Sequence, residues 1–135
     1  MNHGTAAQSI DAGLAQVSRG LSWLFLVGFL LLVGAARGVY SAQELTPSAR
    51  FESLAFIGSI TFLWNWIRQQ CAPHGVTFPM DLACFMAVLW FFLAPYYLWR
   101  GERWRGFAKF GMLIGAHVLS YVATVVVHYV LVWLG

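Results

Sequence analysis

Five polar residues near the C-terminus are those whose types and spacing could do chemistry. They lie in the stretch GAHVLSYVATVVVH and are His117, Ser120, Tyr121, Thr124 and His128. Their spacing of i, i+3, i+4, i+7 and i+11 places all five within about 100° of arc on one helix face. The other residues of this stretch are Gly, Ala, Val and Leu. The sequence therefore predicts a polar stripe, made of these five residues, on an otherwise apolar helix.

The polar stripe has three interpretations. The simplest is hydrogen bonding to a neighbouring helix, which gains roughly 0.6 kcal/mol for each bond in a membrane. Small residues in the same run would let that neighbour approach: Gly111, Gly115, Ala116 and Ala123. The second is tetrapyrrole binding, because a neutral imidazole of His117 or His128 can ligate haem iron or chlorophyll magnesium. The third is a pocket for a quinone, a lipid or a small solute, to which His117 or Tyr121 donates a hydrogen bond.

The spacing of the two histidines bears on the second interpretation. They are 11 residues apart, so roughly 16 Å along the helix, with one toward each leaflet. This would suit two stacked b-type haems, but no other apolar run offers a histidine as the second ligand. Met80, Met86 or the same histidine of another copy would have to serve. A five-coordinate chlorophyll needs only one ligand and fits an unpaired histidine better.

Enzymatic and transport chemistry have little support in the sequence. The chain has no GxSxG, HExxH or phosphate-binding glycine loop, and its two cysteines form no CxxC. The sequence predicts neither a catalytic residue nor a metal site. Glu52 and Asp81 fall at the starts of predicted helices, where acidic residues suit the helix dipole, so no carboxylate is left for the bilayer centre. The sequence does not decide whether Cys71 and Cys84 form a disulfide.

The amino-acid composition of the chain indicates which kind of helices position these polar residues. Of 135 residues, 60% are hydrophobic and 10% are charged, whereas a soluble domain carries about 25% charged residues. The sequence predicts an all-α integral membrane bundle (21–135) of four transmembrane helices with short loops: 21–40, 51–68, 80–99 and 107–134. The polar segment 1–20 has apolar residues at helical spacing and is expected to form an interfacial helix. Pro95 predicts a kink near 91–94.

The basic residues orient the predicted bundle. Four crossings put both termini on one side, and six of the eight basic residues flank the first and third loops: Arg37, Arg50, Arg100, Arg103, Arg105 and Lys109. The positive-inside rule then places these loops in the cytoplasm and both termini outside. The third-loop group Arg100, Arg103, Arg105 and Lys109 is expected to bind anionic lipid headgroups. Because basic residues flank apolar runs and form no patch, nucleic acid is not an expected partner.

Together these features predict a non-catalytic integral subunit that packs laterally in a bacterial inner membrane. Its expected partners are the lipid bilayer and other membrane subunits or copies of itself, with a respiratory or photosynthetic complex as host. Two alternatives remain open. One is a haem- or chlorophyll-binding protein for electron transfer or light harvesting, and the other is a small-solute channel.

Overall fold

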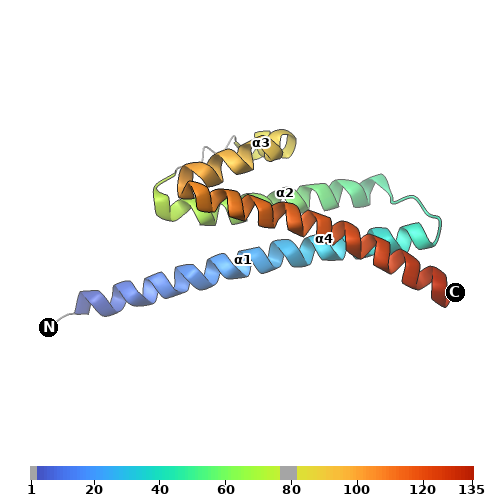
Figure 1. Cartoon of the computed structure of the whole chain (residues 1–135), viewed down its shortest axis with the longest axis horizontal. Helices are drawn as coiled ribbons and strands as arrows, with labels where there is room; N and C mark the ends of the chain where they lie inside the picture. The colour runs from blue at the N-terminus through green and yellow to red at the C-terminus, as the bar shows by residue number, and fades with distance from the viewer. Residues whose placement is uncertain (1–2, 77–81) are drawn as a thin grey trace.

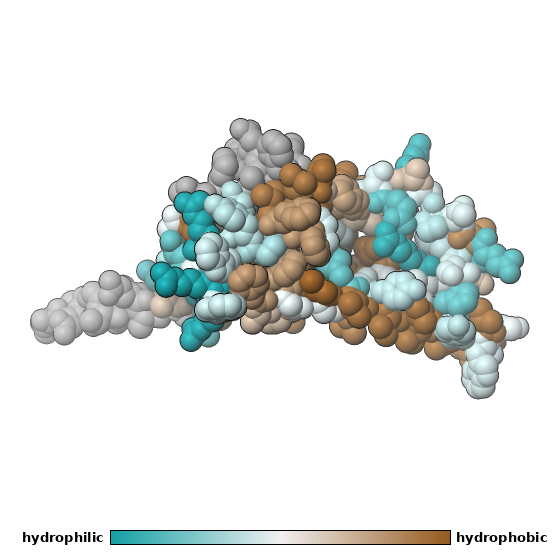
Figure 2. Space-filling view, turned by 45° about the horizontal axis from the view of Figure 1, so that its top comes forward, coloured by the Kyte–Doolittle hydropathy of each residue, from teal (hydrophilic) through white to brown (hydrophobic). Residues whose placement is uncertain are grey.

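The computed structural model describes residues 3–76 and 82–135, which form four α-helices and one short 3-10 helix. The helices are α1 (His3–Ala42), α2 (Ala49–Cys71), η1 (Ala72–His74), α3 (Leu82–Glu102) and α4 (Trp104–Leu134) (Figure 1). No strand occurs in the described ranges. The predicted all-α, four-helix fold is therefore confirmed. Hydrophobic residues cover the middle of the molecule and much of α4, and hydrophilic residues gather toward both ends (Figure 2).

The first helix is longer than the sequence predicted. Residues 3–20, expected as a separate interfacial helix, continue directly into the first apolar run. The stretch 3–42 contains no proline to interrupt it. Its 40 residues span about 60 Å, and the N-terminal part extends beyond the other helices (Figure 1).

The second helix begins and ends with recognisable signals. The Ser48 hydroxyl accepts a hydrogen bond from the Phe51 N–H at 3.2 Å and so caps the first turn. Glu52 lies in the first turn and Arg68 in the last, where their charges suit the helix dipole. As a result α2 extends the predicted helix 51–68 at both ends.

Helices α1 and α4 lie side by side and run parallel. A Cβ added to Gly34 would lie 2.3 Å from the Ser120 carbonyl oxygen, and one added to Gly38 would lie 2.6 Å from that of Thr124. Such distances leave no room for any side chain. The two backbones are therefore in direct contact, and glycine at both positions makes that contact possible.

The third helix does not run the length of the bundle. Its C-terminal part packs beside the end of α2, where the Cys71 thiol donates to the Tyr97 carbonyl at 3.4 Å. Toward its start, Trp90 stacks on His117 of α4, and the backbone leaves helical geometry at Leu89 (φ −116°, ψ 20°). The predicted kink is thus present two residues before the interval 91–94, and α3 stays helical through Pro95. Only the first half of α4 has α3 beside it.

The turn between α3 and α4 is far tighter than the expected loop 100–106. Arg103 alone separates the two helices, with a positive φ of 50°. As a consequence the end of α2, the end of α3 and the start of α4 gather at one end of the molecule (Figure 1). The chain termini lie at opposite ends of the molecule, and α3 returns to the end that α2 reached (Figure 1).

The core lies where all four helices meet. Its largest fully buried side chains are Trp66, Leu26, Ile67, Leu98, Leu113 and Cys71. The indoles of Trp23 and Trp66 pack at 5.0 Å between ring centroids. Since α3 covers only this end, the opposite half of the bundle contains just α1, α2 and α4.

The close approach at Gly34 generates a test. Gly34→Ala should lower the free energy of unfolding by about 1–3 kcal/mol, because the new methyl group forces α4 away from α1. Gly28→Ala is the matched control, since a Cβ there meets nothing within 4 Å and alanine favours helix by about 1 kcal/mol. Reversible unfolding in mixed micelles measures both. Equal stability of the two variants would contradict the packing described.

Candidate functional site

Two residues of the polar stripe face α1. The Ser120 hydroxyl donates to the Leu30 carbonyl at 2.6 Å, and the Thr124 hydroxyl donates to the Gly34 carbonyl at 2.9 Å. Both acceptors are helix carbonyls, which keep a second lone pair for such a bond. The structure therefore places Ser120 and Thr124 in the helix contact, as the first interpretation expects. The glycine pair Gly34 and Gly38 that admits them was not predicted, although its i, i+4 spacing in GAARG is visible in the sequence.

His117 is held by two contacts on different elements. Its ring stacks on Trp90 of α3, with centroids 5.1 Å apart and planes at 11°. Its Nδ1 lies 3.0 Å from the Leu113 carbonyl oxygen, one turn earlier on α4. A carbonyl can only accept, so Nδ1 carries the proton and Nε2 of the neutral ring keeps a lone pair. His117 thus offers one acceptor, Nε2, in a fixed orientation.

His128 has different surroundings. Its Nδ1 is buried and has no hydrogen-bond partner among the described residues. Its ring packs edge-on against Tyr129, with centroids 5.4 Å apart. His117 lines the cavity described below, and His128 is not among the residues that line it. Met80 and the side chain of Met86, the proposed further ligands, lie outside the described residues.

A cavity of about 540 Å³ opens beside the polar stripe, between α1, α2 and α4, with Trp90 of α3 at one end. This volume lies in the range of about 300–1,000 Å³ typical of small-molecule sites. Its apolar wall is formed by Leu30, Val33, Ala55, Phe56, Ile60, Leu63 and Trp90. Its polar wall is formed by Arg37, Glu52, Ser59, His117, Ser120, Tyr121 and Thr124. Four of the five stripe residues therefore line one cavity.

An ion pair between α1 and α2 closes the other end of this cavity. The Arg37 Nε donates to Glu52 Oε1 at 3.1 Å, and a second guanidinium nitrogen bonds the other carboxylate oxygen. This bidentate geometry neutralises both charges and links the two helices. The sequence placed Glu52 correctly at a helix start but did not predict its partner.

Tyr121 is the least constrained member of the polar stripe. It lines the cavity and is 70% exposed. Its hydroxyl makes no hydrogen bond within the described part of the chain. It is therefore a free donor on the cavity wall.

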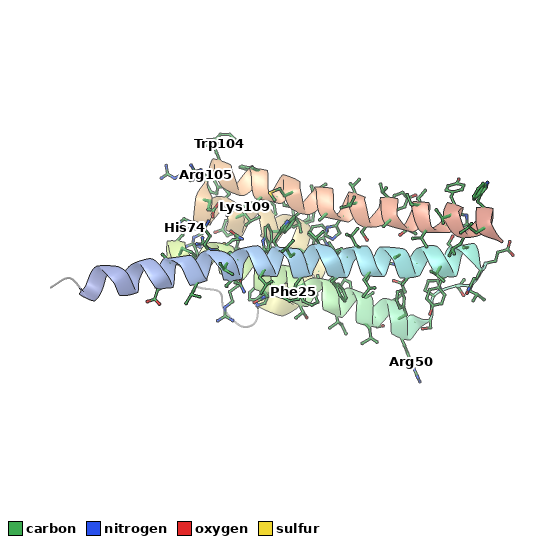
Figure 3. The ribbon with its side chains drawn as sticks, turned by 90° about the horizontal axis from the view of Figure 1, so that it is seen from below. Phe25, Arg50, His74, Trp104, Arg105 and Lys109 are labelled. Carbon is green, nitrogen blue, oxygen red and sulfur yellow. The ribbon has the colours of Figure 1, made fainter. Side chains whose placement is uncertain are left out.

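A second polar cluster ties together the opposite end of the bundle (Figure 3). Lys109 Nζ donates at 2.5 Å both to Glu102 Oε1 and to Gln70 Oε1. His74 Nε2 lies 3.5 Å from Glu102 Oε1. Lys109, expected at lipid headgroups, is thus bonded inside the protein. The other three residues of that group, Arg100, Arg103 and Arg105, are exposed.

The environment of this cluster shifts two ionisable groups. Burial alone would raise the pKa of the Glu102 carboxyl, but the hydrogen bonds and charges of Lys109 and, to a lesser extent, His74 outweigh it and hold that pKa below its usual value. The charged Glu102 carboxylate therefore stabilises the fold at pH values above the ordinary pKa of a glutamate. This stabilisation is lost as the pH falls through the lowered pKa of Glu102. Burial raises the pKa of the free Cys71 thiol to about 11. The side chain of Cys84 lies outside the described residues.

No group of three His, Cys, Asp or Glu side chains within the described ranges lies close enough to hold a metal ion. Asp81 is not among the described residues. Comparisons of the chain with protein-family models, with curated proteins and with solved structures find no match.

Proposed function

We propose that this chain is an integral protein of the bacterial inner membrane and acts as a non-catalytic subunit that packs laterally against other membrane helices. One observation carries the proposal. α4 is 31 residues long, and only 11% of its most apolar stretch is buried inside the chain. Such a helix needs lipid or a partner to cover it, since water would leave a large apolar patch exposed.

The other helices support a membrane location. By length and composition, α1 and α4 are both long and apolar enough to cross a bilayer. α2 has 23 residues, about 35 Å of helix, and exposes Leu54, Phe56 and Ile57. That length matches a hydrocarbon core of about 30 Å.

The contacts of α3 bear on how many times the chain crosses the bilayer. The four-span arrangement expected from the sequence needs α3 to cross the bilayer. The stacking of Trp90 on His117 supports a shorter path, because His117 lies 13 residues from the start of α4, about 20 Å along it. We therefore favour three crossings, by α1, α2 and α4, with α3 as an arm that reaches part of the depth.

Three crossings change how the basic residues are grouped. The end that holds the α3–α4 turn carries six of the eight: Arg19, Arg68, Arg100, Arg103, Arg105 and Lys109. The other end carries Arg50 and Arg37, and Arg37 is paired with Glu52. By the positive-inside rule the N-terminus and the α3–α4 turn face the cytoplasm, and the C-terminus faces outward. The exposed arginines of the turn then lie at the anionic inner leaflet.

A face of α4 is suited to lateral packing. Gly111 and Gly115 are exposed, and a Cβ added to either meets nothing within 4 Å. Their i, i+4 spacing is that of Gly34 and Gly38, which already admit α4 to α1. A helix of another subunit or a second copy can approach here as closely as α1 does on the other face.

The hydrogen bonds of the polar stripe support a non-catalytic role. Ser120 and Thr124 donate their protons to backbone carbonyls and not to an imidazole nitrogen. A serine or threonine nucleophile needs a base within hydrogen-bond reach to be activated. Neither hydroxyl has that arrangement.

Single cysteines test the orientation. In a Cys71→Ser, Cys84→Ser background, Gln16→Cys should be protected from a membrane-impermeant maleimide in intact spheroplasts, and Gly135→Cys should be labelled. Permeabilised spheroplasts give the labelling maximum for each. Labelling of both positions in intact spheroplasts would contradict three crossings and support four.

Larger side chains at Gly111 and Gly115 test whether this face of α4 packs against another helix. Gly111→Leu with Gly115→Leu should weaken association with the partner helix at least tenfold, because the added side chains separate the backbones. Gly28→Leu on α1, also exposed with open space at its Cβ, serves as the control. Association is measured by single-molecule photobleaching in liposomes and by co-purification from the native membrane. Unchanged association of the double variant by both measures would overturn the assignment of this face.

A further inference from the structure

The polar wall of the cavity offers more hydrogen-bond acceptors than donors. Ser120 and Thr124 donate to carbonyls of α1, and Ser59 donates to the Ala55 carbonyl at 2.7 Å. Each hydroxyl proton is therefore used, and each oxygen keeps lone pairs. His117 adds the Nε2 lone pair, since its Nδ1 proton bonds Leu113. The wall presents mainly acceptors to whatever fills the cavity.

Donors on the wall are few. The Arg37 guanidinium uses two of its five N–H groups on the Glu52 carboxylate at one end of the cavity, and the Trp90 indole brings one N–H at the other. The Tyr121 hydroxyl is free, and it lies one helical turn from His117 on the same face of α4. Both residues line the cavity, so its wall offers an acceptor and a donor from positions one helical turn apart. This is the pattern that a hydroxyl group satisfies completely, because it donates one hydrogen bond and accepts another.

The remainder of the cavity fits an apolar body. Leu30, Val33 and Leu63 line its inner side. Phe56 from α2 and Tyr121 from α4 also line it and are 51% and 70% exposed, so the cavity opens laterally. In the described part of the chain, Trp90 is the α3 residue that lines this cavity, and the other lining residues come from α1, α2 and α4. A molecule dissolved in the bilayer could enter here without crossing the headgroups.

We propose that this cavity binds a hydroxyl-bearing amphiphile from the membrane, such as an isoprenoid alcohol or a quinol, with its O–H donated to His117 Nε2 and its oxygen accepting from Tyr121. A molecule that has only acceptors, such as a quinone, leaves the Nε2 lone pair without a donor. Loss of such a bond costs about tenfold in affinity. The site rests on the membrane location proposed above, but it is independent of lateral packing on Gly111 and Gly115.

A matched pair of probes tests the proposal. 4-Hexylphenol and its methyl ether, 4-hexylanisole, share shape and apolar body, and only the phenol can donate. Isothermal titration of the full chain in lipid nanodiscs, with empty nanodiscs subtracted, should give about tenfold tighter binding of the phenol. Equal affinity, tighter binding of the ether, or no saturable binding of either probe would overturn the proposal.

Two variants separate the roles of the polar groups. His117→Phe keeps an aromatic ring against Trp90 and removes Nε2, so it should weaken the phenol about tenfold and leave the ether unchanged. Tyr121→Phe removes the donor and should weaken both probes by a similar factor. Tyr129→Phe, exposed on α4 and outside this cavity, is the control. If His117→Phe weakens both probes equally or neither, the assigned hydrogen bond is wrong.

These outcomes are distinguishable from failure of the proposed function. Labelling of single cysteines and association of the chain are measured without either probe, and both can succeed while the probes fail to bind. Circular dichroism of each variant in the same nanodiscs confirms that the helices are intact.

Discussion

The absence of a side chain at Gly34 and Gly38 is the constraint on which the arrangement of this protein depends. It lets α4 lie directly against the backbone of α1, and only at that distance do the hydroxyls of Ser120 and Thr124 reach the carbonyls of Leu30 and Gly34. In the proposed membrane location the hydrophobic effect does not drive helices together, so close packing and these hydrogen bonds would supply the attraction. The parallel α1–α4 pair is therefore the frame to which α2 and α3 are added.

The limited reach of α3 determines both the cavity and the topology. Trp90 stacks on His117, and the backbone departs from helical geometry one residue earlier. Beyond that level α4 has no α3 beside it, and a cavity with a polar wall lies open between three helices. At the other end, Lys109 joins Glu102 to Gln70 and ties the return of α3 to the end of α2. One short helix thus accounts for an open cavity and for chain termini at opposite ends.

Much of the fold could be predicted from the sequence. Apolar runs separated by short polar segments gave four helices in the right order, and helical spacing placed five polar residues on one face of α4. Such patterns do not determine the number of crossings, because an apolar run of about 20 residues predicts a span whether or not its helix reaches the far side. The tight turn at Arg103 leaves no periodic pattern in the sequence, and Pro95 predicted a kink in α3 but not its position at Leu89. The Arg37–Glu52 pair was missed because it joins separate helices.

The return of α3 is tested most directly by one added cysteine. A Cβ at position 101 would lie 3.5 Å from the Cys71 sulfur, close to the geometry of a disulfide. In a Cys84→Ser background, Gly101→Cys should form an intramolecular disulfide with Cys71 under mild oxidation at alkaline pH, detected by intact mass and by peptide mapping. If α3 instead crosses the bilayer, the two positions lie about 30 Å apart, and both thiols would stay free.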